Sequence, residues 1–235
     1  MKNKLYIGII SVSILMQKVF VSWRGNSLEH QGNFLLSGVP YCDNLVNHNL
    51  YLILWLFPIA VILFLFNGEA KQLYHGYGIL KIIRGESKYK VILKKEASIC
   101  IHSFCILFLY SLIMQESAKF SRAFMKSFLM LYLTFITVLL FQFLLEHFFV
   151  DNIIVFCGIL VWFSSSIMLS NIFRTNDNFE VWQYAIIPNF AFVQRNGLCQ
   201  IQSTPNVCLE LSVLSIIFIL VVICSIAVGN KKDLI

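Results

Sequence analysis

The chain has 235 residues, of which 58% are apolar and only 13% are charged, and its formal net charge is +6. Soluble domains average about 25% charged residues, so this chain has too few charges to cover a globular surface. Its 22 Phe residues are spread along the sequence rather than gathered in one core segment. This composition excludes a soluble globule, a disordered tail and a disulfide-stapled secreted module. It predicts an all-α, polytopic membrane protein.

Six stretches reach the length of a helical membrane crossing, which needs roughly 20 mainly apolar residues. They are residues 5–21, 50–66, 97–115, 127–145, 152–170 and 211–229. Each is continuously apolar and too long for a barrel strand, which alternates over about ten residues. The first stretch could also be a signal peptide, but no small-residue cleavage site follows Met16, which favours a retained helix. We therefore expect a single transmembrane domain over residues 1–235.

The basic residues predict the orientation of the spans, because cytoplasmic loops are enriched in Lys and Arg. With the N-terminus inside, 11 of the 18 basic residues are cytoplasmic and 7 lie outside. The cytoplasmic set is Lys2, Lys4, Lys71, Lys81, Arg84, Lys88, Lys90, Lys94, Lys95, Lys231 and Lys232. The other set is Lys18, Arg24, Lys119, Arg122, Lys126, Arg174 and Arg195. Both termini are expected in the cytoplasm.

Two segments between the spans are unusual. The inner loop, residues 67–96, carries Ile79, Ile82 and Ile83 at helical spacing with Lys81 and Arg84 on other faces. This pattern predicts a short amphipathic helix, either lying on anionic lipid or docking a soluble partner. The outer segment, residues 171–210, has an aromatic and apolar middle, residues 179–194, that Pro188 interrupts. It predicts short interfacial helices or, equally, a cap packed on the helix ends.

The polar and thiol groups give little sign of catalysis or metal binding. His102 is the one ionisable side chain expected inside spans two to six, and Glu146, His147 and Asp151 cluster in a short turn. Both arrangements are more typical of helix packing than of an acid–base set. There is no GxSxG, HExxH or GxxxxGK[ST] motif, no CxxC and no paired-His spacing, so neither a metal nor a bound cofactor is expected. A bridge between Cys199 and Cys208 is open from their spacing and would leave Cys42 over.

The architecture and the inner loop together resemble the permease subunits of type-two ABC exporters (the ABC-2 type). In that family, the loop after span two begins with an acidic residue and continues through a coupling helix, an Arg-x-x-Ser-[Arg/Lys]-like run and a Lys. Here the acidic residue would be Glu69, and the coupling helix would cover residues 79–84. The run would be Arg84, Ser87 and Lys88, and the final Lys would be Lys94 or Lys95. The chain is particularly similar to small permeases found with bacteriocin gene clusters in low-GC Gram-positive bacteria. The resemblance covers the whole chain in architecture and about 25 residues in motif.

The resemblance implies a transport subunit that is not itself an enzyme. A separate ABC ATPase, which would carry ATP and Mg²⁺, would dock under the inner loop, and a second permease copy or a sister permease would complete the pore. Pro58, Trp182, Tyr184 and Phe190 would gate an antimicrobial peptide or another amphipathic, lipid-like cargo. The expected partners are these proteins and the lipid bilayer, and do not include a nucleic acid.

Two other functions remain open from the sequence. One is a stand-alone membrane protein that gives immunity against a bacteriocin without an ATPase. The other is a small intramembrane enzyme that uses His102 or the turn from Glu146 to Asp151.

Overall fold

A computed structural model describes residues 2–23, 34–41, 45–75, 77–114, 121–173, 182–193, 195–196, 198 and 206–231. These residues form helices and short connections, and the described part of the chain contains no strand. The elements are α1 (Lys2–Trp23), α2 (Phe34–Ser37), α3 (Leu45–Leu65), α4 (Glu69–His75), α5 (Tyr77–Ile83), α6 (Lys88–Ile113), α7 (Arg122–Leu145), α8 (Asn152–Phe173), η1 (Gln183–Ala185), η2 (Ile187–Ala191) and α10 (Val207–Lys231). The expected all-α class is confirmed.

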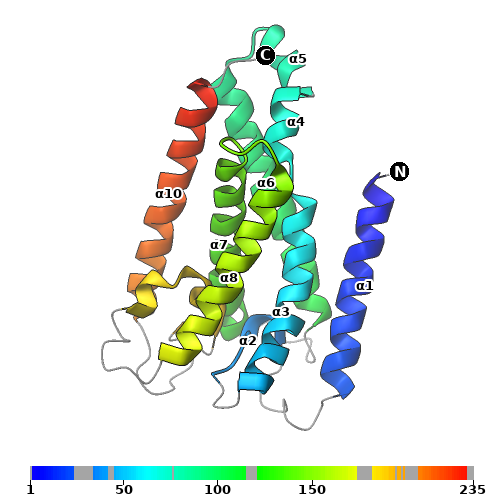
Figure 1. The fold of residues 1–235 in the computed structure, drawn as a ribbon, viewed down its shortest axis with the longest axis vertical. Coiled ribbons are helices and arrows are strands. Elements are labelled where there is room, and N and C mark those ends of the chain that lie inside the picture. Colours follow the sequence, from blue (N-terminus) through cyan, green and yellow to red (C-terminus); the bar gives the residue numbers. More distant parts are fainter. Residues whose placement is uncertain are drawn as a thin grey trace.

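The long helices run along one bundle whose two ends differ. Helices α4 and α5 lie at one end, near the last turn of α10, while α2 and the two short 3₁₀ helices lie at the other end (Figure 1). The first turn of α1 also points toward the α4–α5 end. We call the two ends the α4–α5 end and the α2 end.

Five stretches of the described residues are long and apolar enough to cross a membrane. They are Asn49–Ile83, Lys88–Ile113, Arg122–Leu145, Asn152–Phe173 and Val207–Lys231. The first of them joins α3 to α4 and α5. The expected span over residues 5–21 lies within helix α1, which runs from Lys2 to Trp23 and has an apolar stretch over Gly8–Val19 among the residues whose side chains are described.

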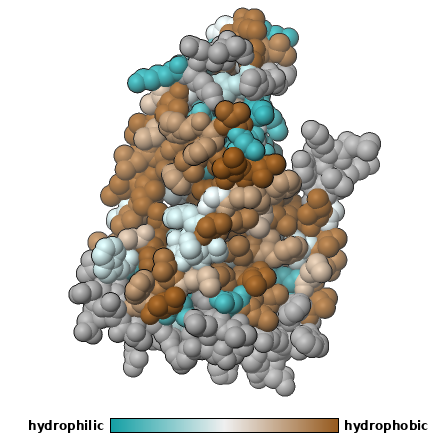
Figure 2. Space-filling model, in the orientation of Figure 1, coloured by the Kyte–Doolittle hydropathy of each residue, from teal (hydrophilic) through white to brown (hydrophobic). Residues whose placement is uncertain are grey.

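The surface of the bundle is apolar over most of its length, as the lipid phase requires. Exposed fractions reach 68% for Ile53, 66% for Val161 and 56% for Ile223, which are values that water would penalise. Figure 2 shows this apolar surface over the middle of the molecule, with much of the hydrophilic surface gathered toward the α4–α5 end. The protein is therefore a multi-pass helical membrane protein.

Helix α7 forms the centre of the bundle and packs against α6, α8, α10 and η2. Its side chains from Thr134 to Leu140 are all buried, so this middle stretch of α7 contacts protein on every side. The two hydroxyl groups in this stretch bond back to the helix, Thr134 to the carbonyl of Met130 and Thr137 to that of Leu133. No polar channel is opened by them.

Several helices begin before the predicted spans, and α6 and α3 are two of them. Helix α6 begins at Lys88, so the part of the inner loop from Lys88 to Glu96 is helical. The reason is that Ser87 has extended backbone at the N-cap and straight-chain Lys residues favour a helix as well as apolar ones do. Helix α3 continues through Pro58 without interruption, from Leu45 to Leu65.

A buried arginine holds the α2 end together. The Arg195 side chain is 3% exposed; its Nε donates to the carbonyl oxygen of Val39 (2.8 Å), and its Nη1 donates to Asn189 Oδ1 (3.1 Å) and the Ile167 carbonyl (3.3 Å). Its guanidinium lies 4.3 Å from the centre of the Tyr41 ring, which adds a cation–π contact. One side chain thus links α8, η2 and the segment after α2.

The segment after α2 approaches the same region closely. Gly38 has a φ of +74°, and a Cβ there would lie within 2.1 Å of the Phe192 ring, so glycine is required on both counts. The Trp55 indole of α3 donates to the Leu35 carbonyl (3.0 Å) and meets the Phe192 ring edge-on at 4.6 Å. The aromatic outer segment is thereby packed on the helix ends as a cap.

Replacing Arg195 tests this cap. Arg195→Ala should lower the free energy of unfolding by about 3 kcal/mol, because several buried carbonyl oxygens lose their donor. Arg195→Lys should recover only part of it, since an ammonium cannot reproduce the planar fork. The measurement is thermal unfolding of the purified protein in detergent. Arg122→Ala, at an exposed arginine, should change stability by less than about 0.5 kcal/mol; equal losses for both variants would contradict the assignment.

Candidate functional site at the α4–α5 end

The turn between α3 and α4 is fixed by a carboxylate from α7. Glu146 follows the last residue of α7 and is 3% exposed. Its Oε1 accepts the backbone N–H of Gly68 at 2.8 Å, and its Oε2 accepts that of Ala70 at 3.1 Å. These N–H groups lie at the start of α4, where backbone N–H groups have no acceptor within the helix. The carboxylate supplies the missing acceptor.

The environment of Glu146 acts on its charge in two directions. Burial raises the pKa of the Glu146 carboxyl, while the N–H groups of Gly68 and Ala70 and the side chain of Gln142 oppose that rise. Gln142 itself lies one turn earlier on α7 and also donates to the Leu63 carbonyl of α3 at 3.3 Å. The result is a small buried polar cluster that ties α3, α4 and α7 together.

Two ion pairs attach the α4–α5 end to α6. Lys95 of α6 pairs with Glu69, the first residue of α4, and both side chains are mostly shielded. Lys94 pairs with Glu86 at 2.8 Å in a more exposed position, and this hydrogen bond lowers the pKa of the Glu86 carboxyl. The exposed pair contributes little stability, whereas the shielded pair contributes to the docking of α4 on α6.

Helices α4 and α5 come close to each other where α5 begins. A Cβ on Gly78 would lie only 2.3 Å from the carbonyl oxygen of Leu73, so the two backbones are in close contact at this point. Helix α5 then presents two kinds of surface. Ile79 and Ile82 are half-buried, with Ile82 packed against the main core, while Leu80 and Ile83 are 49% and 73% exposed.

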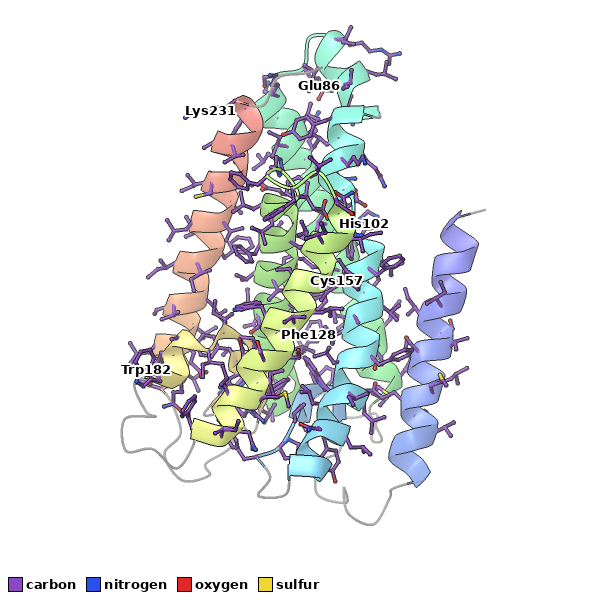
Figure 3. All side chains as sticks on the ribbon, viewed as in Figure 1. Glu86, His102, Phe128, Cys157, Trp182 and Lys231 are labelled. Atoms are coloured by element: carbon purple, nitrogen blue, oxygen red, sulfur yellow. The ribbon has the colours of Figure 1, made fainter. Side chains whose placement is uncertain are left out.

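The predicted docking residues therefore lie together at this end, but in different environments. Ile83, Arg84 and Ser87 are exposed, and Lys81 and Lys88 are half-exposed. Glu69 is used in the ion pair with Lys95. Figure 3 shows Glu86 at the tip of this end, with Lys231 of α10 at the same end of the bundle.

The turn that follows α7 does not assemble an acid–base set. Glu146 caps α4, and the Nδ1 atom of His147 lies 2.8 Å from the Phe143 carbonyl of its own helix. Asp151 is exposed and instead accepts the backbone N–H of Ile153 at 2.9 Å, which caps the start of α8. Tyr74 meets the His147 ring edge-on at 5.5 Å, so His147 takes part in packing between α4 and α7.

His102 faces outward from α6 rather than into the bundle. It is exposed, and its Nδ1 atom lies 2.7 Å from the carbonyl oxygen of Ser98 one turn earlier. This contact is local, between the His102 side chain and the backbone of its own helix.

The predicted gating residues are dispersed. Pro58 is buried within α3, and Trp182 is 66% exposed at the α2 end, where Figure 3 labels it. The hydroxyl of Tyr184 accepts the backbone N–H of Asn206 at 2.8 Å. Phe190 is fully buried and packs with Met130 of α7 and Leu214 of α10. The structure does not bring these four residues to one place.

The thiol and metal predictions are tested only in part. Cys208 carries a free thiol, and Cys199 and Cys42 lie outside the described residues, so the structure gives no support for a bridge. Within the described ranges, no group of three or more His, Cys, Asp or Glu side chains is arranged to hold a metal ion.

Two buried glutamates were missed by the sequence analysis. Glu96 of α6 is 3% exposed and accepts a hydrogen bond from Ser225 of α10. Glu210 of α10 is 1% exposed, and neither of its carboxylate oxygens has a hydrogen-bond partner among the described residues. Both glutamates stand at the ends of the expected loop segments, 67–96 and 171–210. The spacing of core positions, continued toward the N-terminal end of each helix, indicates both of them. Glu210 lies one turn before buried Leu214, and Glu96 lies about one turn before buried Ile99.

The fold and this site define a multi-pass, all-helical membrane protein with a buried polar anchor beneath a short helix pair. The chain belongs to the family described as "Protein of unknown function (DUF2705)", which it matches over residues 10–235. It is 25% identical to the protein described as "Uncharacterized protein YybK" of Bacillus subtilis (strain 168), over 96% of this chain and 94% of that one. No solved structure matches the chain.

Removing the Glu146 carboxylate should loosen the α4–α5 end. Glu146→Ala leaves the buried N–H groups of Gly68 and Ala70 without an acceptor, which should cost about 2–3 kcal/mol of unfolding free energy. Thermal unfolding in detergent measures the loss, and hydrogen exchange of residues 68–75 locates it. Glu86→Ala, at the exposed ion pair, should leave the unfolding temperature close to that of the unchanged protein. If exchange in α4 stays slow in Glu146→Ala, the carboxylate is not the anchor.

Replacing the Glu210 carboxyl, unlike that of Glu146, should not lower the unfolding stability. Glu210→Gln removes an ionisable group that has no partner among the described residues, so unfolding stability should stay within about 0.5 kcal/mol or rise. Glu96→Ala, which removes the carboxylate that Ser225 donates to and leaves it only the Val222 carbonyl of its own helix, serves as the comparison and should lower stability by about 1 kcal/mol. A clear loss of stability in Glu210→Gln would show that this carboxyl has a stabilising partner.

Proposed function

We propose that the chain is the membrane-spanning permease subunit of an ATP-driven ABC exporter of the type-two class. The observation that carries the proposal is the α4–α5 helix pair, which lies at one end of the bundle with Leu80, Ile83 and Arg84 exposed. An exposed apolar residue beside a cation is what a soluble partner with an apolar groove and an acidic rim would bind. In this proposal the partner is a separate ATPase that carries ATP and Mg²⁺.

The attachment of the helix pair supports a role in transmitting force. Helix α4 is bound to α7 through Glu146 and to α6 through Lys95, and the backbone of α5 at Gly78 lies against that of α4 at Leu73. A push on α5 would therefore reach two long helices through buried contacts. Because these contacts are buried hydrogen bonds and ion pairs, the pair would move with the bundle as one body.

The proposed orientation puts the α4–α5 end in the cytoplasm. This end carries Lys71, Lys81, Arg84, Lys90 and Lys231, as the positive-inside rule requires. With α1 as a sixth crossing, both chain ends would lie on that side, in the plasma membrane of a bacterium. The arrangement in Figure 1, with the start of α1 directed toward the α4–α5 end, supports this topology.

The cargo that suits this bundle is apolar or amphipathic. Most buried side chains of the described helices are aliphatic or aromatic, and buried polar ones such as Gln142 and Ser225 bond to neighbouring helices, which suits such a cargo better than a sugar or an ion. An apolar cavity of about 220 Å³, lined by Ile9, Phe57, Phe64 and Phe156 among others, lies between α1, α3 and α8. An antimicrobial peptide or a lipid-like molecule would pass between two permease copies, or between this chain and a sister permease, past the cap with Trp182 and Tyr184.

Charge reversal on α5 tests the docking of the ATPase. Lys81→Glu/Arg84→Glu should reduce the amount of P-loop ATPase that co-purifies with the tagged protein in mild detergent by about tenfold or more, because each opposed charge pair becomes repulsive. Ile83→Asp should act in the same direction by placing a charge in the apolar contact. Mass spectrometry of the purified complex gives the stoichiometry.

The matched control reverses two exposed charges at the start of α7. Arg122→Glu/Lys126→Glu makes the same change in net charge away from the docking surface and should leave ATPase recovery unchanged. Normal recovery in the Lys81/Arg84 variant would refute the docking surface. Purification of the wild-type chain without any ATPase, across several detergents, would refute the exporter and favour a stand-alone immunity protein.

A further inference from the structure

A second feature of the α4–α5 end is a basic cavity between α4, α5 and α6. It has a volume of about 330 Å³ and opens at the protein surface. Its lining contains three lysines, two other polar side chains, two apolar side chains and one glycine. The residues are Gln72, Leu73, Gly78, Lys81, Val91, Lys94, Lys95 and Ser98.

The charges around the cavity favour an anion. Lys94 and Lys95 pair with Glu86 and Glu69, but neither glutamate lines the cavity. Lys94 keeps 59% of its side chain exposed in its pair, so its ammonium still has donors for a ligand. Gln72 and Ser98 add neutral hydrogen-bonding groups beside the lysines. Three lysines line one opening, and a phosphate group can accept hydrogen bonds from more than one ammonium group.

Helix α6 connects this cavity to an exposed apolar stripe. From Ser98, residues at helical spacing on the same face are Ile101, Cys105 and Leu109, and all three are exposed, Ile101 to 63% and Leu109 to 60%. At about 1.5 Å per residue, the stripe from Ser98 to Leu109 is about 16 Å long, which is half of a hydrocarbon core of about 30 Å. An acyl chain of one leaflet has this reach.

We propose that the cavity between α4, α5 and α6 binds the phosphate headgroup of an anionic phospholipid, with an acyl chain along Ile101, Cys105 and Leu109. Lys81, Lys94 and Lys95 hold the headgroup from two helices, so the bound lipid links α5 to α6. The site does not depend on the proposed ATPase. Lys81 would serve both, but the binding experiment below contains no ATPase, so its result and that of the docking test are separate.

The test measures lipid retention by the purified full chain. The protein in detergent is incubated with dioleoylphosphatidylglycerol or dioleoylphosphatidylcholine, passed through size exclusion, and the retained lipid is quantified by mass spectrometry. We expect saturable retention of the anionic lipid, at least tenfold tighter than that of the zwitterionic one. Lys81→Gln/Lys94→Gln should weaken it about tenfold, while leaving the Lys95–Glu69 pair in place.

Controls separate the cavity from bulk charge and the lipid from a soluble anion. Lys71→Gln/Lys90→Gln removes the same charge from exposed lysines of this end that do not line the cavity, and should retain the anionic lipid normally. Glycerol 3-phosphate, which lacks acyl chains, should compete only weakly, and Ile101→Ser should weaken the lipid without affecting glycerol 3-phosphate.

Three results would overturn the proposal. Equal retention of the two lipids would exclude headgroup recognition, and equal losses in the two double variants would assign the effect to net charge. Glycerol 3-phosphate binding as tightly as the lipid would make the cavity a site for a soluble anion.

Discussion

The structure depends most on the carboxylate of Glu146, which joins the end of α7 to the start of α4. In an apolar bundle, free N–H groups at a helix N-terminus are costly, and water reaches this one poorly because Glu146 is 3% exposed. Two hydrogen bonds to Gly68 and Ala70 remove that cost and fix where α4 begins. The position of α5, the ion pair between Lys95 and Glu69, and the basic cavity follow from where α4 lies.

At the two ends of the bundle, backbone groups are hydrogen-bonded by side chains of opposite charge. At the α4–α5 end, carboxylates accept from backbone N–H groups and from lysines. At the α2 end, the guanidinium of Arg195 donates to backbone carbonyl oxygens and stacks on Tyr41. Between them the core is packed with aliphatic and aromatic side chains. This distribution leaves the ends as the places where partners or headgroups can be recognised, and the middle as the region that meets acyl chains.

Most of the architecture could be read from the sequence because the membrane imposes it. A run of apolar residues longer than about 17 has to be a helix in lipid, so five of the expected spans correspond to helices that are long enough to cross. The boundaries were less accurate where polar residues continue a helix, as from Lys88 to Glu96. The roles of Glu146, Glu210 and Arg195 were not foreseen, since each depends on residues that are distant in the chain.

The sequence by itself determined the helical class, the membrane environment and the concentration of charge in the segment from Lys71 to Lys95, because composition and local period are sufficient for these properties. Only the tertiary structure decided which polar residues are buried together. It placed His102 outward, separated Asp151 from Glu146, and brought Lys81 of α5 to the same cavity as Lys94 of α6. These outcomes depend on how helices pack side by side, and packing is set by contacts between side chains far apart in the sequence.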